Sequence, residues 1–181
     1  MRKLIVTEFL TADGVMESPH EWHGPYFDDD MAAAVDARMA ASDALLIGRT
    51  TYEGFAEAWP AMPDEPGAAH MNGVAKYVVS TTLEEAGWNN STVIGENLVK
   101  EITALKEQDG KDITVMGSAT LVQWLLGEGL VDEIELLIDP LIVGHGKRLF
   151  DGGTGAIPLR VLSSRTFATG VQHIVYAPEP A

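Results

Sequence analysis

The sequence contains no cysteine, and only a few of its 181 residues carry a positive charge. Without cysteine the chain forms neither disulfide bonds nor thiolate metal sites, so its composition does not point to an oxidising compartment. Twelve Lys and Arg residues stand against 27 Asp and Glu residues, which gives a formal net charge of −15. Proteins that bind nucleic acids or anionic membranes need a basic surface. The composition therefore predicts neither kind of partner.

Long apolar runs are also missing. The first run, at residues 4–6, is followed directly by Thr7 and Glu8, so it is too short for a secretory signal peptide. No run approaches the roughly 20 residues that a membrane-spanning helix needs. We therefore expect a cytoplasmic protein. Its length and its 46% content of apolar residues suit one domain, which we expect to span residues 1–181.

Three motifs that mark common nucleotide-binding and hydrolase folds are absent from the sequence. The missing G-x-G-x-x-G argues against an ordinary Rossmann domain, and the missing G-x-x-x-x-G-K-[ST] excludes a P-loop. The missing G-x-S-x-G excludes the nucleophile elbow of α/β-hydrolases. A nucleotide site in this chain would have to be built in another way.

The most compact candidate for such a site lies within residues 112–126. An apolar run at residues 113–116 stops at Gly117, and Ser118 opens a helical pattern with leucines on one face. A buried strand, a glycine and a helix with small residues in its first turn allow backbone N–H groups to approach a phosphate. If the chain binds a nucleotide, we expect its pyrophosphate here.

A second junction of this kind follows the predicted strand at residues 43–47. Gly48 and Arg49 precede Thr50 to Glu53, which reads as a capping box with Thr50 at the N-cap. Open α/β sheets bind ligands at the carboxyl ends of parallel strands, where both junctions would lie. Two helix N-termini with Arg49 suit a dinucleotide. The candidate cations for an anionic ligand are Arg49, Lys76, Lys147 and Arg148.

Each of these features also has a structural interpretation. Ser118 can be an ordinary N-cap, and Arg49 can pair with a surface carboxylate. Tyr52 lies on the apolar face of its helix, which favours a place in the core over one in a substrate wall. His20 and His23 are better explained as ordinary loop histidines than as metal ligands, because no partner carboxylate fixes their geometry. No metal site is predicted.

The remaining pattern predicts an α/β fold. Strands are expected at residues 3–10, 43–47, 76–79, 91–94 and 113–116, alternating with helices, of which the first begins at three aspartates, Asp28 to Asp30. Residues 15–27 and 61–73 are expected to be loops. The last third reads as strands only: a half-exposed strand at 131–139, then an antiparallel hairpin at 160–168 and 171–177. The prediction is one mixed, mostly parallel sheet flanked by helices, with antiparallel C-terminal strands.

Several segments, taken in order, resemble the dihydrofolate-reductase-like family. They are L-T-A-D-G (10–14), L-L-I-G-R-T-T-Y-E-G-F (45–55), K-Y-V-V-S-T-T-L (76–83), V-M-G-S-A-T-L-V-Q-W-L (115–125), G-L-V-D-E (129–133) and P-L-I-V-G-H-G-K-R-L-F (140–150). The chain is most similar to the C-terminal reductase domain of the bifunctional riboflavin-biosynthesis deaminase-reductase. The resemblance implies a three-layer α-β-α fold, NADPH as hydride donor, and a homodimer. The implied substrate is a small heterocycle, either pterin-like or like 5-amino-6-ribosylaminouracil phosphate.

The resemblance also implies roles for individual residues. The expected cofactor contacts are Ala12, Gly48, Arg49, Thr50, Thr51, Ser80, Thr81, Met116, Gly117, Ser118, Ala119 and Thr120, with Ala12 at the nicotinamide and Ser80 and Thr81 near the 2′-phosphate. Candidate substrate contacts are Asp13, Trp22, Phe27 and Tyr52. No catalytic acid is assigned, because the tryptophan–proline pattern of the family is absent around Asp28. The alternative is a catalytically silent nucleotide-binding protein of the same fold, acting as a regulatory or sequestering dimer.

Overall fold

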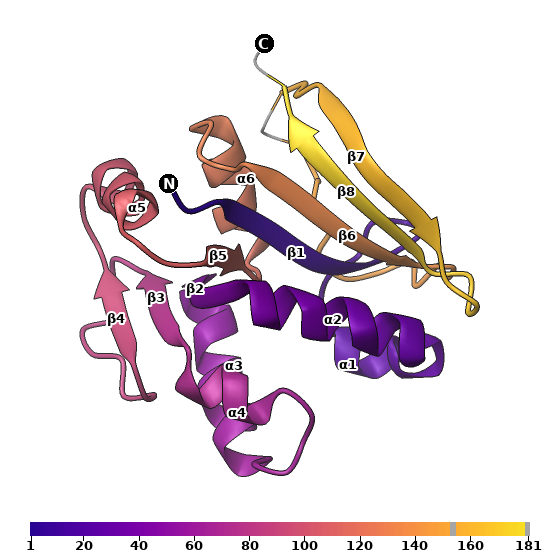
Figure 1. The fold of residues 1–181 in the computed structure, drawn as a ribbon, viewed down its shortest axis with the longest axis horizontal. Coiled ribbons are helices and arrows are strands. Elements are labelled where there is room, and N and C mark those ends of the chain that lie inside the picture. The colour runs from indigo at the N-terminus through magenta and orange to yellow at the C-terminus, as the bar shows by residue number, and fades with distance from the viewer. Residues whose placement is uncertain (153–154, 180–181) are drawn as a thin grey trace.

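The computed structural model describes residues 1–152 and 155–179, and an eight-stranded sheet forms its centre (Figure 1). The strand order is β4-β3-β2-β5-β1-β6-β8-β7. The strands are β1 (Leu4–Thr11), β2 (Ser42–Gly48), β3 (Ala75–Val79), β4 (Ser91–Ile94), β5 (Asp112–Val115), β6 (Glu133–Asp139), β7 (Leu159–Thr166) and β8 (Gln172–Pro178).

Six of these strands, β1 to β6, run parallel, and β8 pairs antiparallel with both β6 and β7. The predicted mixed, mostly parallel sheet with an antiparallel C-terminal hairpin is therefore confirmed. Strand β1 lies between β5 and β6, and its register with β6 extends to the pair Thr11 and Asp139. In β2, residues 44–48 are all buried, as expected for a parallel strand covered on both faces.

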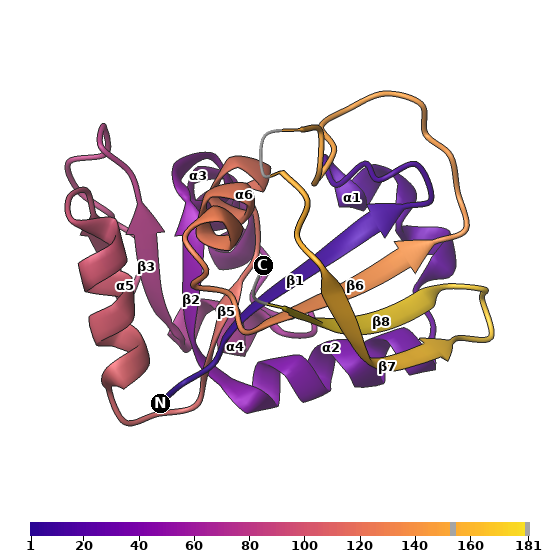
Figure 2. The same ribbon diagram turned by 90° about the horizontal axis from the view of Figure 1, so that it is seen from above.

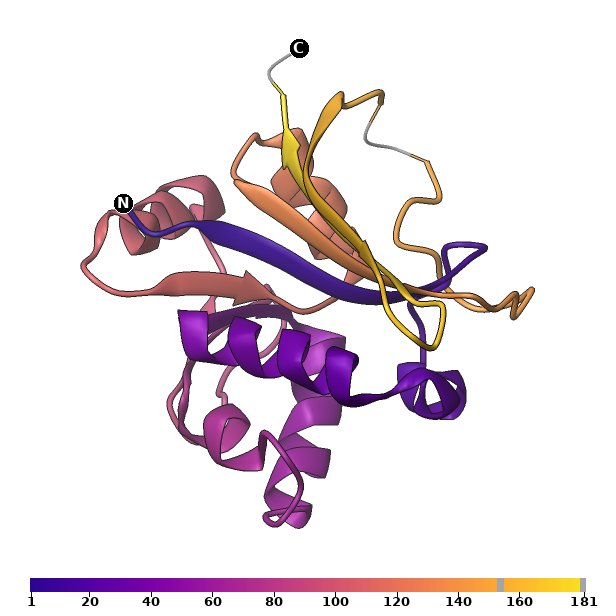
Figure 3. The ribbon, with the colours of Figure 1, turned by 45° about the vertical axis from the view of Figure 1, so that its right-hand side comes forward.

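Helices cover both faces of the sheet. Helices α5 and α6 lie on one face, and α2, α3 and α4 lie on the other, which gives three layers (Figures 1 and 3). The helices are α1 (Pro19–Trp22), η1 (Gly24–Tyr26, a 3₁₀ turn), α2 (Asp29–Ala41), α3 (Arg49–Ala61), α4 (Ala68–Gly73), α5 (Leu98–Glu107) and α6 (Ala119–Gly127). Among the described residues, none of the helices is both long enough and apolar enough to cross a membrane.

Apolar side chains fill the space on each side of the sheet. On the α5 and α6 side, Ile102 and Leu125 belong to a large cluster with residues of β1, β5 and β6. On the other side, Tyr52 and Met71 pack with side chains of β2 and β3. Met31 of α2 packs in a third cluster that includes β6.

Two segments that were expected to be loops contain short helices. Residues 61–73 include α4, and residues 15–27 include α1 and η1. In α4, Ala68 and Met71 are buried against the core beneath α3. Tertiary packing therefore stabilises helical turns that the sequence does not predict, because these segments contain several glycines and prolines, which have low helix propensity.

The expectation that residues 131–139 form a half-exposed strand is wrong. Glu135 is only 8% exposed and Asp139 is completely buried. Strand β6 has a neighbour on each side, and its acidic face is covered, so the carboxylates have protein partners. Glu135 accepts a hydrogen bond from His173 at 2.7 Å and lies 3.4 Å from the Nε atom of Arg38 on α2. The alternation of apolar and acidic residues in this segment therefore reflects a buried polar network, and not the exposure of one face of the strand to solvent.

The carboxyl ends of adjacent strands form one edge of the sheet, and the parallel register places them side by side. In Figure 2, β1 and β6 run next to each other toward the segment that contains α1. The residues at this edge are, in strand order, Ser80 after β3, Gly48 at the end of β2, Gly117 after β5, Ala12 after β1 and Asp139 at the end of β6. The sequence-predicted junctions therefore do meet at one edge.

Candidate active site

The two glycine junctions pack directly against each other. The N–H group of Gly48 donates to the carbonyl of Gly117 at 3.4 Å. A Cβ atom on Gly48 would lie 2.8 Å from the Ser118 hydroxyl, and one on Gly117 would lie 2.7 Å from the Thr51 hydroxyl. Gly117 also has a φ of +58°, which other residues rarely adopt. Both positions thus require glycine, and the close approach brings the starts of α3 and α6 together.

The N-termini of α3 and α6 are completed differently. Ser118 caps α6, as predicted, and its hydroxyl accepts from the N–H group of Leu121 at 3.4 Å. The predicted capping box at Thr50 is wrong: α3 begins two residues earlier, with Gly48 as N-cap and no side-chain cap. Glycine has no side-chain oxygen, so the N-cap residue of α3 offers no side-chain acceptor to the first N–H groups of the helix. Unpaired N–H groups at a helix start bind anions.

Arg49 lies beside the turn that follows β3. Its guanidinium donates to the Thr82 hydroxyl at 3.1 Å and lies 3.6 Å from Glu53, one helical turn along α3. The hydroxyl of Ser80 accepts from the N–H groups of Thr82 and Leu83, at 3.2 and 2.9 Å, and so shapes this turn. The structure thereby brings a cation next to Ser80 and the exposed Thr81. This arrangement suits a phosphate at the end of β3.

A buried acid that sequence analysis did not identify lies below the Gly117 junction. The Oε1 atom of Glu8, on β1, accepts from the N–H group of Gly117 at 2.5 Å. Burial raises the pKa of Glu8 to about 8, against the opposing effect of that hydrogen bond. The carboxyl group is therefore neutral at pH 7 and adds no negative charge beside an anion site. The sequence feature that could have indicated this buried acid is the position of Glu8 within the mostly apolar strand β1.

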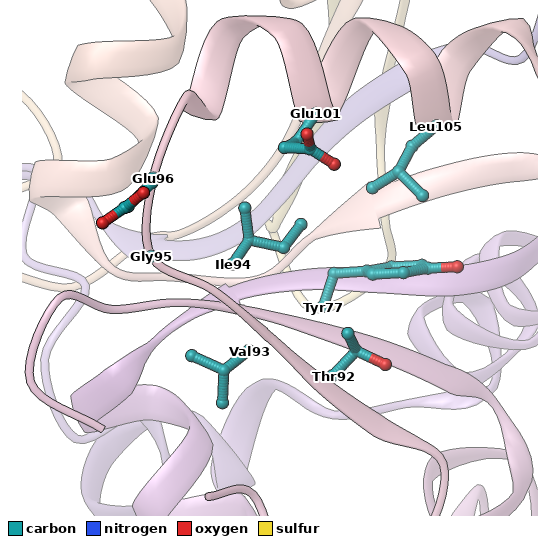
Figure 4. Close-up of a pocket in the computed structure, with 8 residues that line it drawn as sticks. All are labelled: Tyr77, Thr92, Val93, Ile94, Gly95, Glu96, Glu101 and Leu105. Carbon is teal, nitrogen blue, oxygen red and sulfur yellow. The ribbon is translucent and has the colours of Figure 1, made fainter. Parts of the chain in front are cut away.

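A pocket of about 250 Å³ lies between α5 and the strands β3 and β4. Figure 4 shows Tyr77 and Ile94 on one side of it and Leu105 and Glu101 of α5 on the other. The pocket reaches the Ser80 turn, since a Cβ atom on Gly95 would lie 3.1 Å from the Ser80 carbonyl. Its lining, as far as the described residues go, holds two glutamates and no cation. Such a surface fits a flat neutral group better than a phosphate.

Asp13 holds together two loops at the end of β1. Its carboxylate accepts from the Thr11 hydroxyl at 2.6 Å and from the N–H group of Gly144 at 2.9 Å, and Arg148 lies 3.5 Å away. The Thr11 hydroxyl, with the two backbone N–H groups of residues 143–144, lowers the pKa of Asp13 to about 2. Asp13 therefore anchors the loop at residues 143–148 to the turn that carries Ala12.

The three aromatic candidates differ in position. Tyr52 is buried, and its hydroxyl accepts from the N–H group of Trp88 at 2.9 Å, so the structure places it in the core beneath α3. Trp22 is buried in the segment after β1, where its indole donates to the Glu17 carbonyl at 3.0 Å. Phe27 is 49% exposed at the start of α2. Of the three, Phe27 presents most surface to a ligand.

Two other candidates have partners within the protein. Lys76 is fully buried and donates to the carbonyls of Val74 and Asn89 at 2.9 Å, so it does not face a ligand. Burial lowers the pKa of Lys76 to about 8. His23 lies 2.9 Å from Asp139, while His20 is exposed. Within residues 1–152 and 155–179, no group of three or more metal-ligating side chains comes together.

Comparison with known proteins identifies the family. A family model of the RibD C-terminal domain matches residues 2–173. The chain belongs to the RibD C-terminal domain family. A relative, the uncharacterized protein YyaP of Bacillus subtilis (strain 168), is 32% identical over 180 residues, which cover 97% of this chain and 94% of YyaP. The RibD C-terminal domain is a reductase domain, so membership supports an oxidoreductase.

Solved structures confirm the predicted dihydrofolate-reductase-like fold of this RibD-family chain. The diaminohydroxyphosphoribosylaminopyrimidine deaminase/5-amino-6-(5-phosphoribosylamino)uracil reductase of Thermotoga maritima superposes with a TM-score of 0.69 at 16% identity, covering 98% of this chain and 57% of that one. Dihydrofolate reductase from Enterococcus faecalis, in complex with NADP(H) and RAB-propyl, superposes with a TM-score of 0.67 at 12% identity, covering 98% of this chain and 97% of that one.

Proposed function

We propose that this RibD-family chain is an NADPH-dependent reductase that transfers a hydride to a small heterocyclic substrate. The observation that carries the proposal is the mutual packing of Gly48 and Gly117, which joins two helix N-termini at one edge of the sheet. Backbone N–H groups so placed suit the pyrophosphate of a dinucleotide. Membership of a reductase family supports the reaction class.

The other cofactor contacts follow from the order of strand ends. A pyrophosphate at Gly117 and Ser118 directs one half of the dinucleotide toward Arg49 and the Ser80 turn, where Arg49 is available to a 2′-phosphate. The pocket beside Gly95, which has no cation in its lining, accommodates the uncharged adenine ring. The other half then points toward Ala12 at the end of β1. When bound, NADPH supplies the hydride; the protein orients it and excludes water.

The substrate is proposed as a pterin-like or 5-amino-6-ribosylaminouracil phosphate-like ring. The related Thermotoga maritima protein is a 5-amino-6-(5-phosphoribosylamino)uracil reductase, and the Enterococcus faecalis protein is a dihydrofolate reductase. Residues 15–27 and the exposed loop with Lys147 flank the end of β1, where the ring would lie. A homodimer is proposed through β7, the outermost strand, whose residues are all exposed.

A titration of the protein with NADPH, followed by tryptophan fluorescence, tests the proposal. Gly48→Ala keeps an allowed backbone, since φ is −78°, but its methyl group would strike Ser118. We expect this variant to bind NADPH about tenfold more weakly or worse. Gly54→Ala is the matched control, because a methyl group there meets open space on the exposed face of α3.

Turnover is then measured by the loss of NADPH absorbance with dihydrofolate and with 5-amino-6-(5-phosphoribosylamino)uracil. Absence of NADPH binding by the wild-type protein would refute the proposal. Equal binding by the Gly48→Ala and Gly54→Ala variants would show that the cofactor lies elsewhere. Binding without turnover of either acceptor would favour the catalytically silent, sequestering dimer.

A further inference from the structure

A buried histidine–aspartate pair lies at the end of β6, outside the residues assigned to the cofactor. The Nδ1 atom of His23 is 2.9 Å from Oδ2 of Asp139. Asp139 is completely buried and His23 is 8% exposed. The other polar atom of each side chain, Nε2 and Oδ1, is buried and has no hydrogen-bond partner among the described residues. Buried polar atoms almost always have partners, so this pair is built to receive one from outside the chain.

Aromatic rings fix the orientation of His23. The ring of Phe9, on β1, lies 4.1 Å from the imidazole, centroid to centroid. Trp22 and Phe27 meet the imidazole edge-on, at interplanar angles of 87° and 88°. Phe27 is the exposed member of this set, with 49% of its surface accessible. The imidazole is therefore held between β1 and a ring at the protein surface, and displacement of the Phe27 ring would uncover it.

The position of the pair relative to the cofactor site follows from the sheet. A dinucleotide that starts at Ser80 and crosses Gly48 and Gly117 passes β3, β2 and β5, so its far end reaches β1. The next strand is β6, about 4.8 Å further along. Asp139 is the last residue of β6 and pairs with Thr11, which immediately precedes Ala12. The histidine–aspartate pair thus borders the reducing end of the proposed cofactor.

We propose that His23 is the catalytic proton donor of the reductase and that Asp139 is its positioning residue. The inference rests on the function proposed above. NADPH, when bound, would supply a hydride to the carbon of a C=N group of the substrate. The π electrons of that bond move to nitrogen, which takes the proton from Nε2 of His23. The products are the reduced ring, NADP⁺ and a neutral imidazole, which regains a proton from solvent.

Asp139 defines which nitrogen of His23 reacts. A carboxylate at Nδ1 holds the proton there and stabilises the positive charge that the ring carries when Nε2 is also protonated. Only Nε2 then exchanges a proton with the substrate. In the purely structural alternative, the pair serves only to tie residues 19–27 to β6. That role predicts loss of stability, but no selective loss of turnover, when His23 is replaced.

His23→Gln and its control His20→Gln separate these roles. Glutamine retains hydrogen-bonding capacity but cannot carry the proton. His20 is an exposed histidine of α1, the short helix that His23 caps at its C-terminus. With the acceptor that the wild type reduces faster, dihydrofolate or 5-amino-6-(5-phosphoribosylamino)uracil, we expect His23→Gln to lower kcat about a hundredfold. NADPH affinity should not change. Asp139→Asn should lower kcat and leave KM unchanged, and His20→Gln should match the wild type.

A second measurement does not depend on turnover. In a protein labelled with ¹⁵N at histidine, binding of NADP⁺ should shift the Nε2 resonance of His23 and leave those of His20 in place. Turnover by His23→Gln equal to the wild type would overturn the inference while leaving the proposed reductase intact. An unmoved His23 resonance with NADP⁺ bound would also overturn it. If the wild type does not bind the cofactor at all, both the proposed function and this inference are refuted.

Discussion

Replacement of Glu8 by glutamine should make the protein more stable, by an amount that grows with pH. Glu8 is buried beneath the Gly117 junction, and burial raises its pKa from 4.5 to about 8. Between these two values the carboxyl group is protonated in the folded protein and ionised in the unfolded chain. The folded state then binds more protons, so stability falls as pH rises through this window. Glutamine removes this titration and keeps an oxygen that accepts from Gly117.

The magnitude follows from the size of the pKa shift. Each pH unit within the window costs the wild type about 1.4 kcal/mol of unfolding free energy. At pH 7, about 2.5 units above the unfolded value of 4.5, the accumulated cost is about 3.4 kcal/mol. Above a pH of about 8 the cost levels off near 4.8 kcal/mol, because Glu8 is then ionised in both states. Below a pH of about 4.5 the variant and the wild type should have similar stability.

Urea denaturation at several pH values between about 5 and 8, followed by tryptophan fluorescence, measures this difference. The difference between Glu8→Gln and the wild type isolates Glu8, because all other titrating groups are common to both proteins. Glu57→Gln, at an exposed position on α3, should follow the wild type at every pH. Curves for Glu8→Gln and the wild type that stay parallel across the whole range would refute the argument.

Three further predictions concern the cofactor, the core and the interface. Ser80→Asp retains an oxygen that can accept the hydrogen bonds of the turn, but its negative charge repels a 2′-phosphate. The preference for NADPH over NADH should therefore fall about tenfold in competition titrations. An unchanged ratio of the two affinities would place the 2′-phosphate elsewhere. Lys76→Met leaves the carbonyls of Val74 and Asn89 without a donor and should cost about 2–4 kcal/mol in urea denaturation. A loss below 1 kcal/mol, on the order of experimental error, would show that water replaces the ammonium group. Val161→Lys, on exposed β7, should convert the proposed dimer to a monomer, as measured by light scattering. The control Val99→Lys, on α5, should leave the dimer intact. A dimer that persists in Val161→Lys would exclude β7 as the dimer interface.

Much of the fold was predictable because local patterns and tertiary packing agree. The apolar runs of β2 and β5 and the strand-only pattern of the last third predicted strands where the structure has them. Ser118 is the predicted N-cap of α6, and the three aspartates predicted at the start of the first long helix do lie at the start of α2. The helix α4 escaped prediction because its six residues are held by burial of Met71, which no local pattern reveals. The burial of β6 was not predicted for a similar reason, because the partners of its acidic residues come from distant segments of the chain.

The candidate site was predictable only where backbone chemistry defines it. Glycine, a small first turn and a strand end are visible in the sequence, so Gly48 and Gly117 were identified as junctions. Their contact with each other depends on strand order, which places β5 between β2 and β1. The pairs Glu8 with Gly117 and His23 with Asp139 join residues more than a hundred positions apart. Single-sequence patterns carry no signal for such pairs, although a carboxylate within an apolar strand is a reason to look for one.

The neutral carboxyl group of Glu8 would couple the proposed binding of an anion at Gly117 to the uptake of a proton. A phosphate near Gly117 adds negative charge beside Glu8 and so raises its pKa above the value of about 8 that burial alone gives. Around pH 8, where part of the population is ionised, cofactor binding would then draw protons from the buffer. The heat of binding would depend on the ionisation enthalpy of that buffer, and affinity would decline as the solution became more alkaline. The protonation state of Glu8 on β1 would in this way set the affinity of the site at Gly117 for the cofactor.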